Sequence, residues 1–175
     1  QYLPDLLEIT SARAVPKPVS DPEIPMMNAS MTVSALRQWF QYDGIHYPYN
    51  TVFVLGLDNT HISGIVDKKI LFEITADPET PLSQVMSRKV YSVYADNSLH
   101  LAVEFMLKTG QNILPVFDRV SRSLEGFVTE SDVLGVFGER IRHDEHQSRH
   151  ISMVSATLRV ISKSKQYFAS RTNRA

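Results

Sequence analysis

Thr129 and Asp132 place a hydroxyl and a carboxylate three residues apart, where a run of strand-forming residues passes directly into a run with helical spacing. A threonine just before a helix can accept a hydrogen bond from the backbone N–H three residues on. An aspartate in the first turn is favoured by the positive end of the helix dipole. A capped helix start of this kind is also suited to hold the hydroxyls and phosphates of a nucleotide.

The same pair has a purely structural interpretation as a capping box, which would stabilise the helix by ~1 kcal/mol. A charge-assisted hydrogen bond from a ribose hydroxyl to Asp132 would contribute ~1.5–3 kcal/mol. That is enough to change an affinity tenfold or more. Both interpretations can hold at once, because a capping residue can also contact a ligand.

The bulk composition is that of an ordinary globular protein. The chain has 175 residues, of which 43% are hydrophobic and 21% charged, and its formal net charge is −1. It has no cysteine, which excludes disulfides and thiolate metal sites. No run approaches the ~18 apolar residues of a membrane span. Because it begins at Gln1 without a methionine, we expect a piece of a longer protein.

Enzyme chemistry has little support in the sequence. The chain offers no cysteine nucleophile, no glycine-rich phosphate loop of the usual spacing and no metal-binding histidine pair with a matching base. His143, His146 and His150 follow at helical spacing, which suits a metal ion. Their segment is highly charged and lacks apolar periodicity, so a solvated extension is the better interpretation. We therefore expect neither an enzyme nor a metal site.

The order of expected elements occurs twice along the chain, as strand, helix, hairpin and helix. Gly64 and Gly126 mark equivalent places 62 positions apart, and Gly44 and Gly110 correspond as helix ends. Each copy is small, so we expect the two to bury a shared face. The expected strands are 24–27, 51–55, 61–66, 90–94, 113–117 and 124–128; helices are expected over 28–40, 67–74, 81–86, 96–107 and from 129 onward.

This order predicts an α+β protein with two packed repeats. We expect a linker over 1–20, the first repeat over 21–75, the second over 80–142 and a C-terminal extension over 143–175. The proline-broken linker should lie along the folded body. Within the extension, Ile151 to Ile161 has an amphipathic stripe that suits docking. The basic end, 163–175, is expected to be loose.

The residues and the repeat together resemble a tandem pair of CBS domains, a Bateman module. The match is specific in the second copy, over Ala95 to Met106, then Gly110, Leu114-Pro115-Val116 and Gly126 to Leu134. The first copy keeps Gly64-Ile65-Val66. It has Asp67 in place of the motif threonine and Ile70 in place of the motif aspartate.

The resemblance implies a cleft between the repeats that binds an adenosine nucleotide (ATP, ADP or AMP). The aspartate of the motif holds the ribose hydroxyls and the threonine lies near ribose or phosphate, which assigns Asp132 and Thr129 to these roles. Pro115, which also matches the family pattern, is predicted to belong to the same nucleotide site. Tyr49, just before the first hairpin, is placed to stack on the base, as is Tyr47. Since the first copy lacks the pair, one nucleotide per chain, or none, is expected.

CBS pairs are usually regulatory attachments, and Tyr2 to Leu7 resembles the segment that links the last membrane helix of CLC chloride channels and transporters to their cytoplasmic CBS pair. The resemblance implies a homodimer on the cytoplasmic side of a membrane, attached to a transport domain and without nucleic acid. Two alternatives stay open: a structural dimerisation module without ligand, and the CBS pair of a magnesium or other cation transporter.

Tyr47 and Tyr49 have an alternative role in covering the core or the dimer surface. Trp39 and Phe40 lie at helical spacing with Leu36, which predicts packing rather than ligand contact.

Overall fold

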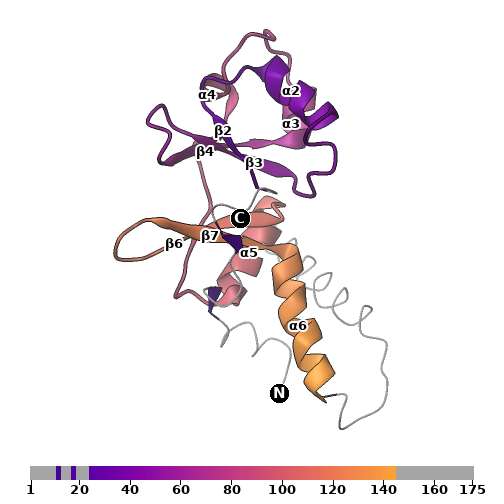
Figure 1. Ribbon diagram of the computed structural model, residues 1–175, viewed down its shortest axis with the longest axis vertical. Helices are drawn as coiled ribbons and strands as arrows, with labels where there is room; N and C mark the ends of the chain where they lie inside the picture. The colour runs from indigo at the N-terminus through magenta and orange to yellow at the C-terminus, as the bar shows by residue number, and fades with distance from the viewer. Residues whose placement is uncertain (1–10, 13–16, 19–23, 145–175) are drawn as a thin grey trace, which may run out of the picture.

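The computed structural model describes residues 11–12, 17–18 and 24–144. They form two bodies stacked along the long axis of the molecule (Figure 1). The elements are β1 (Lys17–Pro18), β2 (Met26–Asn28), α2 (Val33–Gln41), β3 (Thr51–Leu55), β4 (Ile62–Asp67), α3 (Lys68–Glu73), α4 (Leu82–Val85), β5 (Val93–Tyr94), α5 (Leu99–Thr109), β6 (Ile113–Phe117), β7 (Leu124–Thr129) and α6 (Glu130–Asp144).

The two bodies are the predicted repeats. Repeat 1 runs from β2 to α3 and has a sheet of order β2-β3-β4; repeat 2 runs from β5 to α6, and its sheet has the order β1-β7-β6-β5. In each repeat the first strand is parallel to the next one, which then pairs antiparallel with its hairpin partner. The predicted α+β fold with two repeats is confirmed.

The two hairpins match residue by residue. Thr51 pairs with Asp67 in repeat 1, and Ile113 pairs with Thr129 in repeat 2. Both hairpins shift register at the same place, between the fourth and fifth residues of their first strand. A spacing of 62 positions therefore relates every residue of these strands, as the two glycines predicted.

Helix α2 of repeat 1 forms because its apolar residues recur at helical spacing. Val33, Leu36 and Phe40 are buried, and the Thr32 hydroxyl caps the helix by accepting from Ala35 N at 3.2 Å. Trp39 packs against the same core. The prediction that the aromatic residues of this helix serve packing is confirmed.

Helix α5 of repeat 2 buries Leu99, Ala102 and Met106 in the same way. It ends at Gly110, whose φ of 75° suits glycine and whose N–H donates to Met106 O at 2.8 Å. Gly44 corresponds to Gly110 only in part: α2 ends at Gln41 with Tyr42 as its cap, and Gly44 N donates back to Trp39 O at 2.7 Å. Gly44 serves another purpose, since a Cβ there would lie only 2.4 Å from the Trp39 ring.

The shared face between the repeats has its own apolar cluster. Ile24, Tyr49 and Phe53 from the repeat 1 side meet Ile113 and Phe127 from repeat 2. The rings of Phe53 and Phe127 are fully buried, with centroids 5.1 Å apart. Burying each ring contributes ~1.5–3 kcal/mol. The expected shared face is confirmed.

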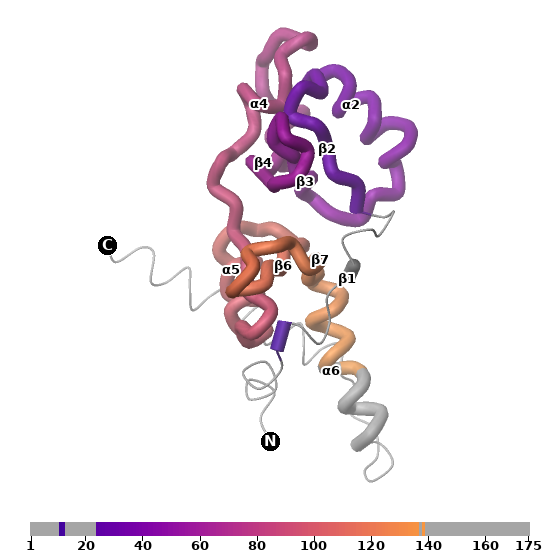
Figure 2. Tube along the Cα trace, turned by 60° about the vertical axis from the view of Figure 1, so that its left-hand side comes forward, coloured from indigo at the N-terminus to yellow at the C-terminus, as the bar shows by residue number. Residues whose placement is uncertain are grey.

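The segment that precedes repeat 2 packs on repeat 1. In Figure 2 this chain runs down one side of the molecule from α4 to the lower body. Leu82 of α4 is buried in the core of repeat 1 and donates to Met31 O at 2.8 Å. Ser87 exchanges two backbone hydrogen bonds of 2.9 Å with Ile65 of β4. A Cβ on Gly64 would lie 2.9 Å from Ser87 O, so a glycine allows this approach.

The segment that precedes repeat 1 packs reciprocally on repeat 2. Ala12 is fully buried in the core of repeat 2, and its N–H donates to Asn97 O at 2.8 Å. Lys17 and Pro18 of β1 pair with Phe127 and Gly126 of β7. The described residues of the predicted linker thus lie along the folded body, as expected.

The remaining expectations differ in extent. The strand expected over 90–94 comprises only Val93–Tyr94. Helix α6 continues to Asp144, slightly into the predicted C-terminal extension. Residues 145–175, which include His146, His150, the stripe of 151–161 and the basic end, lie outside the described residues, as does the side chain of His143.

Candidate functional site

Thr129 and Asp132 form a reciprocal capping box at the start of α6. The Thr129 hydroxyl accepts from Asp132 N at 3.1 Å, and Thr129 N donates to Asp132 Oδ2 at 3.0 Å. Thr129 is fully buried and Asp132 is partly exposed. Within the described part of the chain, the other carboxylate oxygen of Asp132 has no hydrogen-bond partner. A partly exposed carboxylate oxygen of this kind can accept a hydrogen bond from a ligand.

Strand β7 turns Thr129 toward repeat 1. Val128 belongs to the core of repeat 2, whereas Phe127 belongs to the cluster between the repeats. Because side chains alternate along a strand, Thr129 lies on the same face as Phe127. The capped start of α6 is therefore at the boundary between the two repeats.

Pro115 lies on the same inter-repeat face. It is buried in β6 and stands opposite Phe127 in the hairpin register. Its neighbours Leu114 and Val116 both point into the core of repeat 2. By alternation, Pro115 points the other way, toward repeat 1. Thr129, Asp132 and Pro115 thus come from one hairpin and the helix that follows it.

Tyr49 is buried in the cluster between the repeats, at 8% exposure. Its ring meets that of Tyr47 edge-on, with centroids 5.3 Å apart. The Tyr47 hydroxyl donates to Thr51 O at 2.7 Å. Burial, and then the neighbouring Tyr49, raise the pKa of Tyr47, which keeps the phenol protonated. Both rings pack between elements here, and contact of Tyr49 with a base stays a prediction.

The equivalent place in repeat 1 has a helix cap but no carboxylate at the position of Asp132. Asp67 accepts from Ile70 N at 3.1 Å and so caps α3 as Thr129 caps α6. Ile70 stands at the position of Asp132, and it is 55% exposed. Lys68 and Lys69 occupy the first turn. The predicted asymmetry between the two copies is thus visible in their side chains.

An asparagine pair that was not predicted joins the two repeats. Asn50 N donates to Asn112 Oδ1 at 3.0 Å, and Asn112 N donates to Asn50 Oδ1 at 3.4 Å. Their amide groups donate in turn to Gly110 O and Pro48 O. The carbonyls of the same two asparagines accept from the first residues of α3 and α6. The signal was present in the sequence, since the two asparagines are 62 positions apart.

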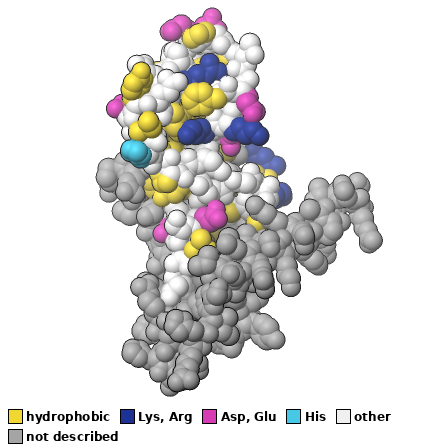
Figure 3. All heavy atoms as spheres, turned by 90° about the vertical axis from the view of Figure 1, so that its right-hand side faces the viewer, with side chains coloured by type: hydrophobic (Ala, Val, Ile, Leu, Met, Phe, Trp, Pro, Cys, Tyr) yellow, Lys and Arg dark blue, Asp and Glu magenta, His cyan; other side chains and the backbone are white. Residues whose placement is uncertain are grey.

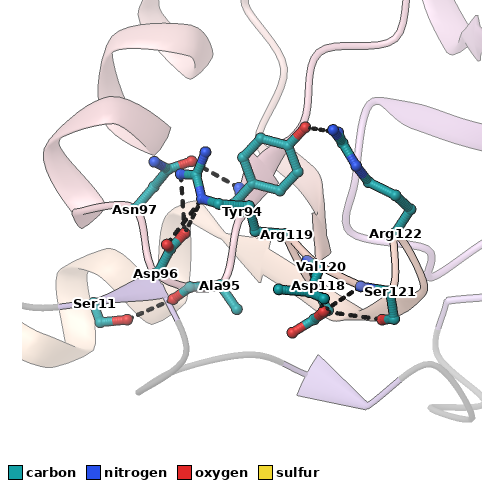
Figure 4. A network of polar contacts seen from close by, with 10 residues as sticks. All are labelled: Ser11, Tyr94, Ala95, Asp96, Asn97, Asp118, Arg119, Val120, Ser121 and Arg122. Atoms are coloured by element: carbon teal, nitrogen blue, oxygen red, sulfur yellow. Dashed lines mark hydrogen bonds and ion pairs between the residues drawn. The ribbon is translucent and has the colours of Figure 1, made fainter.

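A second polar network lies at the β6–β7 turn (Figure 4). The Arg119 guanidinium forms an ion pair with Asp96 at 2.9 Å and lies over the Tyr94 ring, 4.3 Å from its centroid. Its hydrogen bonds to Asp96 raise the pKa of Arg119. Arg122 donates to the Tyr94 hydroxyl from the other side. These contacts tie the turn to the residues after β5.

Among the described residues, no group of three or more histidine, cysteine or acidic side chains is placed to hold a metal ion. None of their helices is long and apolar enough to cross a membrane.

The sequence profile of the CBS domain family matches residues 82–139. This segment forms a CBS domain. It contains the hairpin and the helix start that carry Thr129 and Asp132, so the predicted resemblance of the second copy is confirmed. No match was found among curated proteins.

Solved structures share the fold of the CBS pair. The soluble part of a magnesium transporter aligns with a TM-score of 0.59 at 19% identity, over 79% of this chain and 52% of that one. The cytosolic domain of the Mg2+ channel MgtE in complex with ATP gives 0.54 at 26% identity, over 66% and 45%. The CBS domain of a bacterial CNNM/CorC family Mg2+ transporter in complex with ATP gives 0.60 at 18%, over 75% and 89%.

The chain thus spans about half the length of the first two of these structures. The similarity at such low identity establishes the fold of the pair. CBS domains are regulatory rather than catalytic modules, and the three structures named above are parts of magnesium transport proteins.

Proposed function

We propose that this CBS pair is a regulatory module of a membrane ion channel or transporter and that it senses an adenosine nucleotide at Thr129 and Asp132. The observation that carries the proposal is the Asp132 carboxylate, which stands in the first turn of a capped helix with one oxygen left for a ligand. The ATP complexes of MgtE and of the CNNM/CorC transporter support a nucleotide as that ligand.

In this proposal the ribose hydroxyls donate to Asp132, while Thr129 holds the adjacent ribose or phosphate. Tyr49 and Pro115 belong to the inter-repeat face and are the residues proposed to contact the base. Binding would act through differential affinity, because a nucleotide that contacts both repeats stabilises the arrangement in which they bind it best. The change in population then reaches the attached transport domain.

Calorimetry with ATP, ADP and AMP tests this proposal. Asp132→Asn keeps an oxygen for the Thr129 N–H but removes the charge, so we expect affinity to fall about tenfold or more. Asp67→Asn, at the cap of repeat 1, is the matched control and should leave the affinity nearly unchanged. No heat from any of the three nucleotides, or equal affinity in the Asp132 variant, would overturn the proposal.

A second proposed role is homodimer formation. Phe72 and Leu134 stand at equivalent positions of α3 and α6, and they are 43% and 37% exposed. Ile70 adds a third exposed apolar side chain on α3. Figure 3 shows hydrophobic side chains beside lysine and arginine side chains on one face of repeat 1. Burying such side chains in a second copy would stabilise a dimer.

Sedimentation equilibrium of the wild type and of a Phe72→Ser/Leu134→Ser variant tests the dimer. We expect the variant to shift toward monomer, with Leu57→Ser, at an exposed turn residue, as the control. A dimer without nucleotide binding would favour the purely structural alternative.

For the transported ion, the proposals are chloride or, as the alternative, magnesium or another cation. The resemblance of Tyr2 to Leu7 to the CLC connector favours a chloride channel or transporter, with the module on the cytoplasmic side. The magnesium transporters among the similar structures favour the alternative. Ion flux through the full-length protein, measured separately for chloride and Mg2+, decides between them.

A further inference from the structure

We propose that the N-terminal contacts of the chain report occupancy of the Thr129–Asp132 site to the residues before Ser11. This inference rests on the proposed nucleotide function. The N-terminal contacts are those of Ser11 and Ala12 with the residues after β5, and those of β1 with β7. They connect the start of the chain to repeat 2, although the next repeat along the chain is repeat 1.

The first contact anchors the chain in the core next to α6. Ser11 Oγ donates to Ala95 O at 2.5 Å, and Ala12 N donates to Asn97 O at 2.8 Å. Ala12 is fully buried in the same apolar cluster as Val133. Val133 directly follows Asp132 in the first turn of α6. Because the cluster is closely packed, a change in the position of that turn alters the packing around Ala12.

The second contact is on the strand that ends at the site. Lys17 pairs with Phe127 and Pro18 with Gly126, which places β1 at the edge of the sheet beside β7. Thr129 is the last residue of β7. The segment before repeat 1 is thus hydrogen-bonded to the backbone that positions the Thr129 hydroxyl.

The network of Figure 4 makes the first anchor stiff. Asn97 Oδ1 accepts from Tyr94 N at 2.7 Å, and Asp96 is held by Arg119 in an ion pair at 2.9 Å. Arg119 belongs to the β6–β7 turn, so its ion pair connects the loop that binds Ser11 and Ala12 to the hairpin. The hairpin carries both Pro115 and Thr129.

Linkage gives the consequence. If a nucleotide stabilises the start of α6 and the end of β7, it also stabilises the N-terminal contacts, and loss of those contacts must weaken nucleotide binding by the same factor. A coupling of this kind typically changes affinity by about fivefold or more. An attached transport domain that pulls on Ser11 would likewise act on the nucleotide site.

The experiment uses the whole 175-residue chain. Hydrogen exchange of the Ala12 amide is measured with and without saturating ATP, and we expect ATP to slow it about fivefold or more. ATP affinity is then measured for Ala12→Asp, which places a carboxylate in the core, and we expect a loss of about fivefold or more. Leu36→Ala, a core variant of repeat 1, controls for general destabilisation and should keep its affinity.

The milder variant Ser11→Ala removes the hydroxyl that donates to Ala95 O. It replaces Ala12→Asp if circular dichroism shows that Ala12→Asp does not fold. If ATP binds the wild type while exchange at Ala12 and affinity in the folded variant stay unchanged, the inference is overturned and the nucleotide function stands. If ATP does not bind but ADP or AMP does, the same measurements are made with that nucleotide. If none of the three binds the wild type, both proposals fall together.

Discussion

Helices α3 and α6 start at equivalent positions of the two repeats, yet their first turns carry opposite charge. Repeat 1 has Lys68 and Lys69 after its cap, while repeat 2 has Glu130 and Asp132. Both helices are capped through a side-chain oxygen, from Asp67 in one case and Thr129 in the other. A capped helix therefore forms at this place with or without an acid in its first turn.

The difference separates structural need from ligand chemistry. Lysines in the first turn oppose the helix dipole, and α3 forms nevertheless, because Leu71 is buried in the core of repeat 1. Asp132 is thus not required for a helix to begin here. A ligand that donates hydrogen bonds, as proposed above, would give Asp132 a role beyond the helix cap.

The comparison of the two repeats depends on the apolar face that they share. Phe53→Ala should disrupt this face and have the largest effect on stability. Removing a fully buried ring leaves a cavity against Phe127 and should lower the free energy of unfolding by ~3–5 kcal/mol. Urea unfolding measures the change. Combined with Phe127→Ala, the double-mutant cycle should show a coupling of ~0.5–3 kcal/mol. Additive losses would contradict packing between the repeats.

Gly64→Ala tests whether the segment before repeat 2 is tied to repeat 1. The new Cβ would lie 2.5 Å from Met86 Sδ and 2.9 Å from Ser87 O. We expect a loss of ~1–3 kcal/mol in unfolding free energy, because the backbone of Ser87 has to move. The matched control is Gly135→Ala in α6, where a Cβ meets nothing within 4 Å. It should stabilise the protein by up to ~1 kcal/mol.

The charge comparison can be sharpened by giving repeat 1 the chemistry of repeat 2. Asp67→Thr/Ile70→Asp restores the motif at equivalent positions, and the variant should bind a second nucleotide. Titration calorimetry should then give a stoichiometry near two instead of one, with the new site weaker than that of Asp132. Asp67→Thr alone is the control, and it should keep the original stoichiometry. If the stoichiometry of the double variant is unchanged, a threonine and an aspartate at these positions are not enough to bind a nucleotide, and the site of Asp132 needs further residues around it.

The smallest expected effect compares the two hairpin turns at acid pH. Hydrogen bonds from Thr60 N at 3.0 Å and from His61 hold the pKa of Asp58 below its usual value. A lowered carboxyl pKa stabilises the folded state above about pH 4, and this stabilisation is lost as the pH falls. Asp58→Asn should therefore show a smaller drop in urea midpoint between pH 6 and pH 3 than the wild type. Asp118→Asn, in the other hairpin turn, is the matched comparison. If the urea midpoint falls by the same amount in all three proteins, the lowered pKa of Asp58 is contradicted.

Much of the fold could be predicted because it depends on local patterns. The helical spacing of Val33, Leu36 and Phe40 predicts α2, and the run from Thr51 to Leu55 predicts β3. The spacing of Gly64 and Gly126 predicts two matching hairpins. These features follow from side-chain periodicity and backbone preference, which act over a few residues and are readable along the chain.

The helix cap of the candidate site was equally readable. A threonine followed three residues later by an aspartate bonds within one turn, and the structure has both hydrogen bonds of the capping box. The chemical difference between Asp132 and Ile70 is likewise a property of the sequence alone. Nucleotide binding by this pair remains a proposal, because the same two side chains serve both the helix cap and the proposed ligand contact.

Only the tertiary structure decided which distant segments meet. Ala12, before repeat 1, packs in the core of repeat 2, and Leu82, before repeat 2, packs in the core of repeat 1. Each connector thus packs on the repeat other than the one that it directly precedes. Asn50 and Asn112 likewise bond only because two hairpins meet face to face. Such contacts form because whole apolar surfaces are buried against one another. A local sequence pattern does not specify which surfaces these are. The opening pair, Thr129 and Asp132, therefore owes its cap to the sequence and its place between the repeats to the fold.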